Sequence, residues 1–188
     1  MTNKPTLSNA WRRNHSSIRA IELASSIRSL RKVVGTLTDD DECIVNYNAK
    51  AGAGSFNAAG KEIRIDPEYA VKSTPISDSD FDVLTGLTVH EAMHSVCDSK
   101  SIRSDNQKAA RGTVTPESLA VVGEEIYCDG YASRHYKTPG KYIRAARNAY
   151  TIDPEKIKWS NVINAWIATS VYRHLPPDNI PDRTLNLL

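Results

Sequence analysis

Two histidines and a glutamate stand in a spacing that is typical of a catalytic metal site. Residues 90–94 read His-Glu-Ala-Met-His, an HExxH motif. Histidines four positions apart lie on one face of a helix, so both imidazoles can reach a single Zn²⁺ at about 2.0 to 2.1 Å. Between them, Glu91 lies near enough to take a proton from a water that the metal activates. The motif therefore predicts one zinc ion on His90 and His94, with Glu91 as the general base.

Chance is a poor explanation of this motif. The 5 histidines and 9 glutamates among 188 residues give roughly 0.006 expected occurrences of HExxH. The alternative is an ordinary helix that carries two histidines and an incidental glutamate. Leu87, Val89 and Met93 indicate that the helix is largely buried, and burying His and Glu without a partner is costly. The pattern therefore favours a metal site.

A third protein ligand is available about thirty residues downstream. Glu125 and Asp129 are four positions apart, so they project from the same face of a helix. We expect Glu125 to complete a His₂Glu set, and Asp129 to accept the outer N–H of a ligand histidine and so fix its tautomer. Glu124 is the alternative ligand, but it would put the weak S–H donor of Cys128 in the supporting position, so we favour Glu125. Ala132, one turn farther along, would let the two helices pack closely.

The two motifs together resemble those of the gluzincin metallopeptidases. HEAMH followed by EIYCDGYA at 125–132 is similar to the thermolysin-like, the integral-membrane CAAX-protease-like and the small minimal gluzincins, whose second motif runs E-x-x-x-D. NAAGKEIRID at 57–66 resembles the strand that precedes the active-site helix in this family, and the likeness covers about residues 55–136. It implies zinc at His90, His94 and Glu125, catalysis by Glu91 and support from Asp129.

The family also uses a His, Tyr or Arg from elsewhere in the chain to stabilise the oxyanion of the tetrahedral intermediate. The nearby candidates are Tyr127, Tyr131, Arg134 and His135. By helical angle, Tyr131 and His135 lie well off the face of Glu125. The oxyanion donor is therefore left unassigned.

Helices that position these side chains are predicted from hydrophobic period and helix-breaking residues. The turn and N-cap residues 77–80 open the helix that carries HExxH, and Thr115-Pro116-Glu117 opens the helix that carries Glu125. We expect Gly35 to end the first helix and Thr138-Pro139-Gly140 to end the third. The predicted helices cover about 16–34, 80–98, 116–136, a shorter stretch to about 150, and 154–171.

A small sheet is predicted before the HExxH helix. Strands are expected at 43–47 and 62–65, and the segment 54–58 is extended and joined to the second of these through Ala59-Gly60. Its small residues would permit an extended substrate to add as a strand along this edge. The proposed substrate edge comprises Gly54, Ser55, Phe56, Asn57 and Ala58. The fold class is α+β and zincin-like: mostly helical, with one small twisted sheet and the metal between two helices.

Composition sets the outer limits of these predictions. A length of 188 residues favours a single domain over 15–188, and the polar, aperiodic residues 1–14 are predicted to be a disordered tail. The contents of 40% hydrophobic and 24% charged residues exclude a fully disordered or fibrous protein. Without a long apolar run or a secretory signal, the chain is expected to be cytoplasmic and not membrane-bound. Three cysteines without CxxC spacing argue against a disulfide scaffold or thiolate zinc site, and indicate reduced thiols.

These features predict a zinc metallopeptidase that acts on a peptide or protein substrate. The alternative is a catalytically silent, zinc-stabilised interaction module of a larger assembly, such as the front part of a longer protein, because the chain ends in a polar, extended stretch. Retention of Glu91 favours the enzyme, since a structural zinc site has no use for a base. A net charge of +2 disfavours nucleic acid as a partner.

Overall fold

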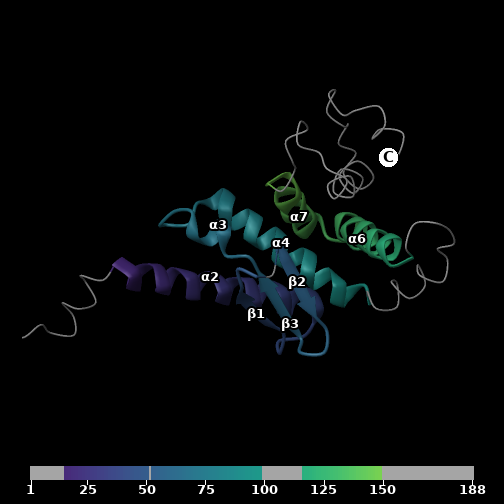
Figure 1. The fold of residues 1–188 in the computed structure, drawn as a ribbon, viewed down its shortest axis with the longest axis horizontal. Helices are drawn as coiled ribbons and strands as arrows, with labels where there is room; N and C mark the ends of the chain where they lie inside the picture. Colours follow the sequence, from purple (N-terminus) through teal and green to yellow (C-terminus); the bar gives the residue numbers. More distant parts are fainter. Residues whose placement is uncertain (1–14, 51, 99–115, 150–188) are drawn as a thin grey trace, which may run out of the picture.

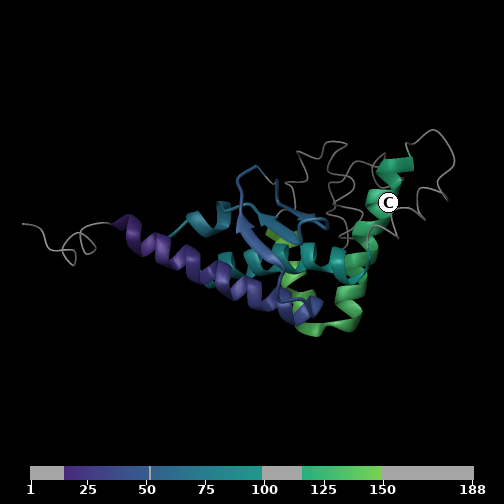
Figure 2. The same ribbon diagram turned by 90° about the horizontal axis from the view of Figure 1, so that it is seen from below.

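A computed structural model describes residues 15–50, 52–98 and 116–149 of the chain. Within these ranges the elements follow one another around a long central helix, α4 (Figures 1 and 2). The elements in order are α2 (His15–Thr38), β1 (Ile44–Tyr47), β2 (Gly54–Asn57), β3 (Glu62–Ile65), α3 (Glu68–Val71), α4 (Asp78–Val96), α6 (Pro116–His135) and α7 (Lys137–Ala149).

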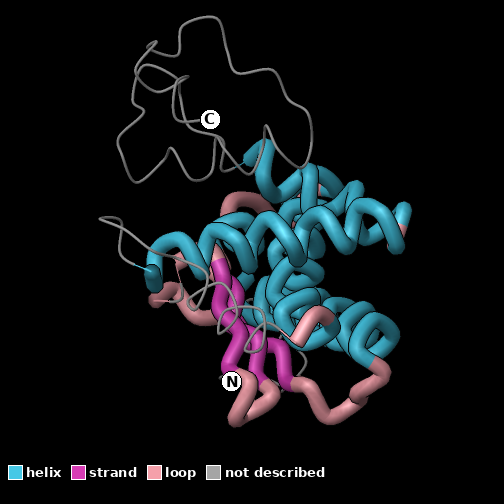
Figure 3. Tube along the Cα trace, turned by 90° about the vertical axis from the view of Figure 1, so that its right-hand side faces the viewer, coloured by secondary structure: helices cyan, strands magenta, loops and turns pink. Residues whose placement is uncertain are grey.

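The three strands form one mixed sheet in the order β1-β3-β2. The central strand β3 runs parallel to β1 and antiparallel to β2, with Val45 opposite Ile63 and Gly54 opposite Ile65. Figure 3 shows the strands gathered on one side of the molecule. Since side chains alternate across a strand, Val45, Ile63 and Ile65 all point into the core and are buried, while Ile44 is exposed. In the strand order β1-β3-β2, β2 lies at one edge of the sheet.

Two apolar clusters hold the helices in place. The first joins α2, the sheet and the first half of α4, and includes Leu30, Ile63 and Leu84, which are fully buried. The second joins the last part of α4 to α6 and α7, and consists of Val89, Met93, Cys128, Ala132 and Ile143. Because α4 contributes to both clusters, its residues 83–93 are buried all round. Helix α4 is therefore the central element of the fold.

Helix α4 begins within the predicted N-cap cluster 77–80, two residues before the predicted start at Asp80. The Ser77 side chain accepts a hydrogen bond from the backbone N–H of Asp80 at 3.2 Å, and the helix starts one residue after Ser77, at Asp78. It ends at Val96, two residues before the predicted end. The α+β class, mostly helical with one small sheet, is confirmed for the described residues. Within these residues, no helix has both the length and the apolar character that crossing a membrane requires.

One predicted helix end is wrong, and another helix ends near the predicted residue 136 without the residues expected to end it. Gly35 does not end the first helix, which continues to Thr38 and is followed by Asp39 at φ +53°, the left-handed conformation that commonly terminates a helix. Gly35 instead makes room for a neighbour, because a Cβ there would lie 2.6 Å from an oxygen of Asp41. Thr138-Pro139-Gly140 lies in the first turn of α7, where proline is tolerated, and the break falls at Tyr136.

One predicted strand is one residue shorter than expected, and several other predicted segments lie outside the described residues. The extended segment is confirmed as β2 over Gly54–Asn57, but Ala58 lies in the turn that leads to β3. The short helix α3 was not predicted. The tail 1–14, the loop after α4 and the helix predicted at 154–171 lie outside the described residues.

Close packing between α4 and α7 gives a test of this fold. A Cβ on Gly86 would lie 2.0 Å from the Tyr142 carbonyl oxygen and 2.8 Å from the Ala146 Cβ, so Gly86→Ala must push α7 away. We expect it to lower the free energy of unfolding by about 2 kcal/mol. Gly130→Ala is the control: its nearest neighbour is the flexible Arg134 guanidinium at 3.5 Å, so it should raise helix stability by about 0.5–1 kcal/mol. Thermal unfolding of both variants measures this, and shifts of the same sign would contradict the packing.

Candidate metal centre

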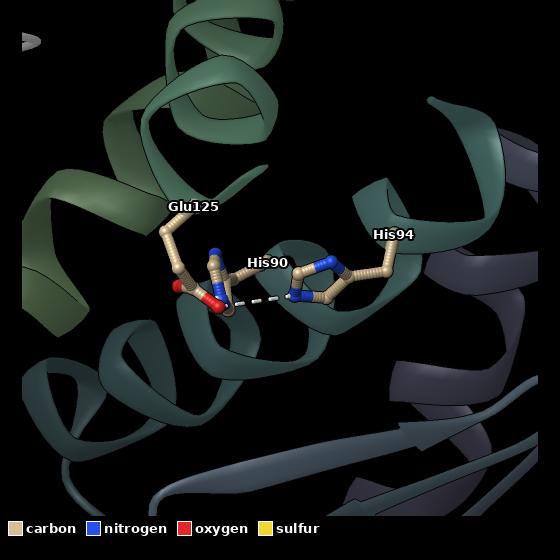
Figure 4. Close-up of side chains that lie close together, drawn as sticks. All are labelled: His90, His94 and Glu125. Atoms are coloured by element: carbon tan, nitrogen blue, oxygen red, sulfur yellow. Dashed lines mark ion pairs between the residues drawn. The ribbon is translucent and has the colours of Figure 1, made fainter. Parts of the chain in front are cut away.

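Helices α4 and α6 bring the two motifs of the sequence together. His90 and His94 point from α4 toward the carboxylate of Glu125 on α6 (Figure 4). The Nε2 atom of His90 lies 3.0 Å from Glu125 Oε2, and the Nε2 atom of His94 lies 3.6 Å from Glu125 Oε1. The same nitrogen of each ring thus faces the same carboxylate. The three side chains converge as the spacing of the motifs predicts.

The donor set of this group fits a zinc ion. One ligand atom each from His90, His94 and Glu125 lies within 4.8 Å of the other two. Ligand atoms around a tetrahedral zinc with bonds of about 2.1 Å are about 3.4 Å apart, so small rotamer changes suffice. Two imidazoles and one carboxylate are the three protein ligands of one established kind of catalytic zinc site, which leaves a fourth position open. The group is able to hold a metal ion.

The outer nitrogen of each histidine has its own buried carboxylate. His90 Nδ1 lies 2.7 Å from Asp129 Oδ1, and His94 Nδ1 lies 2.9 Å from Glu124 Oε1. Asp129 is 0% and Glu124 is 1% exposed, so both contacts are shielded from water. A proton on Nδ1 of each ring would be donated to these carboxylates, leaving both Nε2 atoms as electron-pair donors.

This arrangement bears on the choice between Glu124 and Glu125. Glu125 faces the Nε2 atoms of both rings, whereas Glu124 lies at the far nitrogen of His94. The favoured assignment, with Glu125 in the metal group and Asp129 behind a histidine, agrees with the geometry. Sequence reasoning missed that the unfavoured carboxylate, Glu124, supports the second histidine in the same way.

Sequence reasoning also missed Arg147. Its side chain comes from α7 and donates two hydrogen bonds, from Nε to Asp129 Oδ2 at 2.8 Å and from a terminal nitrogen to Glu125 Oε2 at 2.9 Å. One guanidinium therefore fixes both the metal-facing carboxylate and the carboxylate behind His90. The sequence indicates its position only weakly: Arg147 stands four residues after the buried Ile143, and so lies on the side of α7 that faces the core.

Electrostatics within the site follow from this concentration of carboxylates. Burial disfavours the charged form of His90, but the charges of Asp129 and Glu125 outweigh it and raise its pKa well above the usual value. Burial likewise opposes charge on His94, yet hydrogen bonds with Cys128 and Glu124 raise its pKa to about 9. Burial would raise the pKa of Glu125, but the nearby His90 lowers it. The site thus favours bound cationic charge.

Glu91 is buried on α4 and lies against strand β2 of the sheet. Its side chain reaches β2, because a Cβ built on Gly54 would lie 2.7 Å from Glu91 Oε1 and 3.0 Å from Glu91 Cγ. Only a residue without a side chain fits at position 54 while Glu91 stays in place. Burial raises the pKa of the Glu91 carboxyl. Edge strand and expected general base are therefore in direct contact.

Candidate oxyanion donors remain unassigned. Tyr127, Tyr131 and His135 stack on one another along α6, with ring centroids 6.1 Å apart for the first pair and 4.2 Å for the second. Tyr127 is 44% exposed. These three side chains thus contact one another along α6, and their contacts do not identify an oxyanion donor.

No family model, curated protein or solved structure matches this chain. The likeness to gluzincins consequently rests on the motif residues. Their geometry in the fold is the independent support for a metal centre.

The contact between Asp129 and His90 gives a direct test of this centre. We expect Asp129→Asn to weaken zinc binding about 10- to 100-fold, because the neutral amide is a poorer acceptor for the ring N–H and loses its ion pair with Arg147. Competition with a chromophoric chelator measures the affinity. Asp82→Asn, at an exposed position near the start of α4, is the matched control and should bind zinc as the unmodified protein does. Equal affinities for both variants would contradict the role of Asp129.

Proposed function

We propose that the protein is a zinc-dependent peptidase of the gluzincin type. The observation that carries the proposal is the position of Glu91: it stands between the two metal-facing histidines on α4 and touches the edge strand at Gly54. A site that only stabilised the fold would need neither a base nor an open sheet edge beside it. Peptide hydrolysis uses both.

Each group of the site has a task in this reaction. His90, His94 and Glu125 would hold the ion, and Zn²⁺, when bound, supplies the Lewis acidity that makes water more acidic and polarises a peptide carbonyl. Glu91 would take the proton from the attacking water and pass it to the leaving amine nitrogen. Burial raises the pKa of Glu91, which makes its carboxylate a stronger base.

Substrate binding is proposed along β2. In the described part of the chain, β2 is hydrogen-bonded to β3 and to no second strand, so its other edge has backbone groups available to an extended peptide. Ser55 and Asn57 are exposed, whereas Gly54 and Phe56 are half-buried toward the core. Backbone pairing would place a peptide carbonyl near Glu91 because β2 already touches that side chain at Gly54.

Replacing the base tests the proposal. Glu91→Gln keeps the shape of the side chain but cannot accept the proton, so we expect zinc binding to persist while cleavage falls about 10²- to 10⁴-fold. A digest of a broad peptide library, analysed by mass spectrometry before and after chelation of the metal, measures cleavage. Glu68→Gln, at an exposed position of the short helix α3, is the matched control and should retain full activity. A zinc-loaded protein that cleaves no library peptide would support the interaction module instead, and an active Glu91→Gln variant would remove Glu91 as the base.

The contact between the edge strand and the base can be tested separately. In Gly54→Ala the new methyl group would lie 2.7 Å from Glu91 Oε1, so Glu91 must move. We expect zinc binding to persist and kcat to fall at least about 10-fold, since small misplacements of a reacting group are costly. Ser55→Ala, at the neighbouring exposed position, should leave kcat within about twofold of the unmodified protein. Unchanged kcat in Gly54→Ala would show that Glu91 and β2 are not coupled.

A further inference from the structure

The guanidinium of Arg147 joins two carboxylates of the metal centre. Its Nε atom donates to Asp129 Oδ2 at 2.8 Å, and its Nη2 atom donates to Glu125 Oε2 at 2.9 Å. The side chains of Arg147 and Glu125 are 20% and 21% exposed, and that of Asp129 is 0% exposed. Because both donors belong to one planar group, their relative positions are fixed. The orientation of the Glu125 carboxylate therefore depends on that of Asp129.

Packing of α7 against its neighbours determines where this guanidinium lies. The Tyr69 hydroxyl donates to the Ala149 carbonyl oxygen at 3.3 Å, which ties the end of α7 to α3. Ala146, the residue before Arg147, is buried where α7 meets Gly86 of α4. The last turn of α7 is thus held by both α3 and α4. Arg147 consequently has little freedom to move away from Glu125.

The oxygens of the two carboxylates differ in their partners. Asp129 Oδ1 lies 2.7 Å from His90 Nδ1, while Oδ2 accepts from Arg147. Glu125 Oε2 also accepts from Arg147 and lies 3.0 Å from His90 Nε2. Within the described residues, Glu125 Oε1 accepts no hydrogen bond and faces His94 Nε2 at 3.6 Å. Oε1 is therefore the oxygen best placed to serve a metal ion.

We propose that Arg147 is a positioning residue that restricts Glu125 to a single ligand oxygen, and so keeps the fourth position at the metal open for water. This inference rests on the proposed metal site. An oxygen that accepts a charge-assisted hydrogen bond has less electron density to give to a second cation, so Oε2 is the poorer ligand. If both oxygens bound the ion, the second would occupy the position that water needs. Arg147 acts only through Glu125, and the proton transfers remain with Glu91.

Two variants of Arg147 separate its charge from its geometry. Arg147→Lys keeps the positive charge but replaces the planar pair of donors with one nitrogen, and Arg147→Met removes charge and donors at similar length. The probe is Co²⁺, which accepts the same nitrogen and oxygen ligands as zinc. Its visible absorption bands are intense in four-coordinate sites and weaker in five-coordinate sites. We expect intense bands in the unmodified full chain and weaker bands in both variants.

Catalysis by the zinc-loaded proteins gives the second measurement. We expect kcat to fall about 10- to 100-fold in both variants while KM changes little, because the water position is lost and the binding edge of β2 is not altered. Arg144→Lys, at an exposed position three residues earlier on α7, is the matched control and should change neither the cobalt bands nor kcat. Circular dichroism shows whether each variant is folded. If Arg147→Met does not fold, Arg147→Lys alone decides.

Three results would overturn the proposal: unchanged cobalt bands in a folded Arg147→Lys variant, weakened bands with unchanged kcat, or a protein that binds no cobalt. A purely structural role would lower thermal stability and leave the bands as they are. The proposed function fails on different grounds, when the metal-loaded unmodified protein cleaves no peptide. In that case the cobalt bands of the variants still decide whether Arg147 controls the coordination of Glu125.

Discussion

Close approach of α4 and α6 is the constraint on which the rest of the structure depends. A small residue of α6 permits it, because Ala132 is fully buried in the apolar cluster that joins α6 to the last part of α4. The approach sets two imidazoles from one helix among carboxylates from the other, with Asp129 at 0% exposure and His90 at 8%. Buried charges of one sign are costly unless a cation compensates them. The buried carboxylates of α6 are therefore stabilised by nearby positive charge, and a metal ion bound at His90, His94 and Glu125 would add to it.

A third helix and the sheet complete this arrangement from outside. From α7, Arg147 donates to both Asp129 and Glu125, so the carboxylates are held from behind while the histidines face them from the front. From the sheet, Gly54 lets the backbone of β2 approach Glu91. Helix α7 thus contacts the site through the side chain of Arg147. Strand β2 contacts it through the backbone at Gly54, where the lack of a side chain leaves room for Glu91.

Local spacing explains how much could be predicted from the sequence. His90 and His94 stand four apart, as do Glu125 and Asp129, and a helix fixes such pairs on one face wherever it packs. Arg147 could not be predicted in this way, because its role depends on how α7 packs against α4. The end of the first helix also escaped prediction: Gly35 carries the usual terminating signal, but the helix continues to Thr38 and the left-handed conformation falls at Asp39. Pairwise helical spacing is thus readable from sequence, whereas packing between distant elements is not.

The central claim is that His90, His94 and Glu125 hold one zinc ion with a position left open. Anomalous diffraction at the zinc absorption edge, from crystals of the zinc-loaded protein, tests this claim most directly. We expect one strong peak about 2.0 to 2.2 Å from the Nε2 atoms of both histidines and from a carboxylate oxygen of Glu125. A crystal without a peak there, or with zinc bound by a different set of side chains, would contradict it.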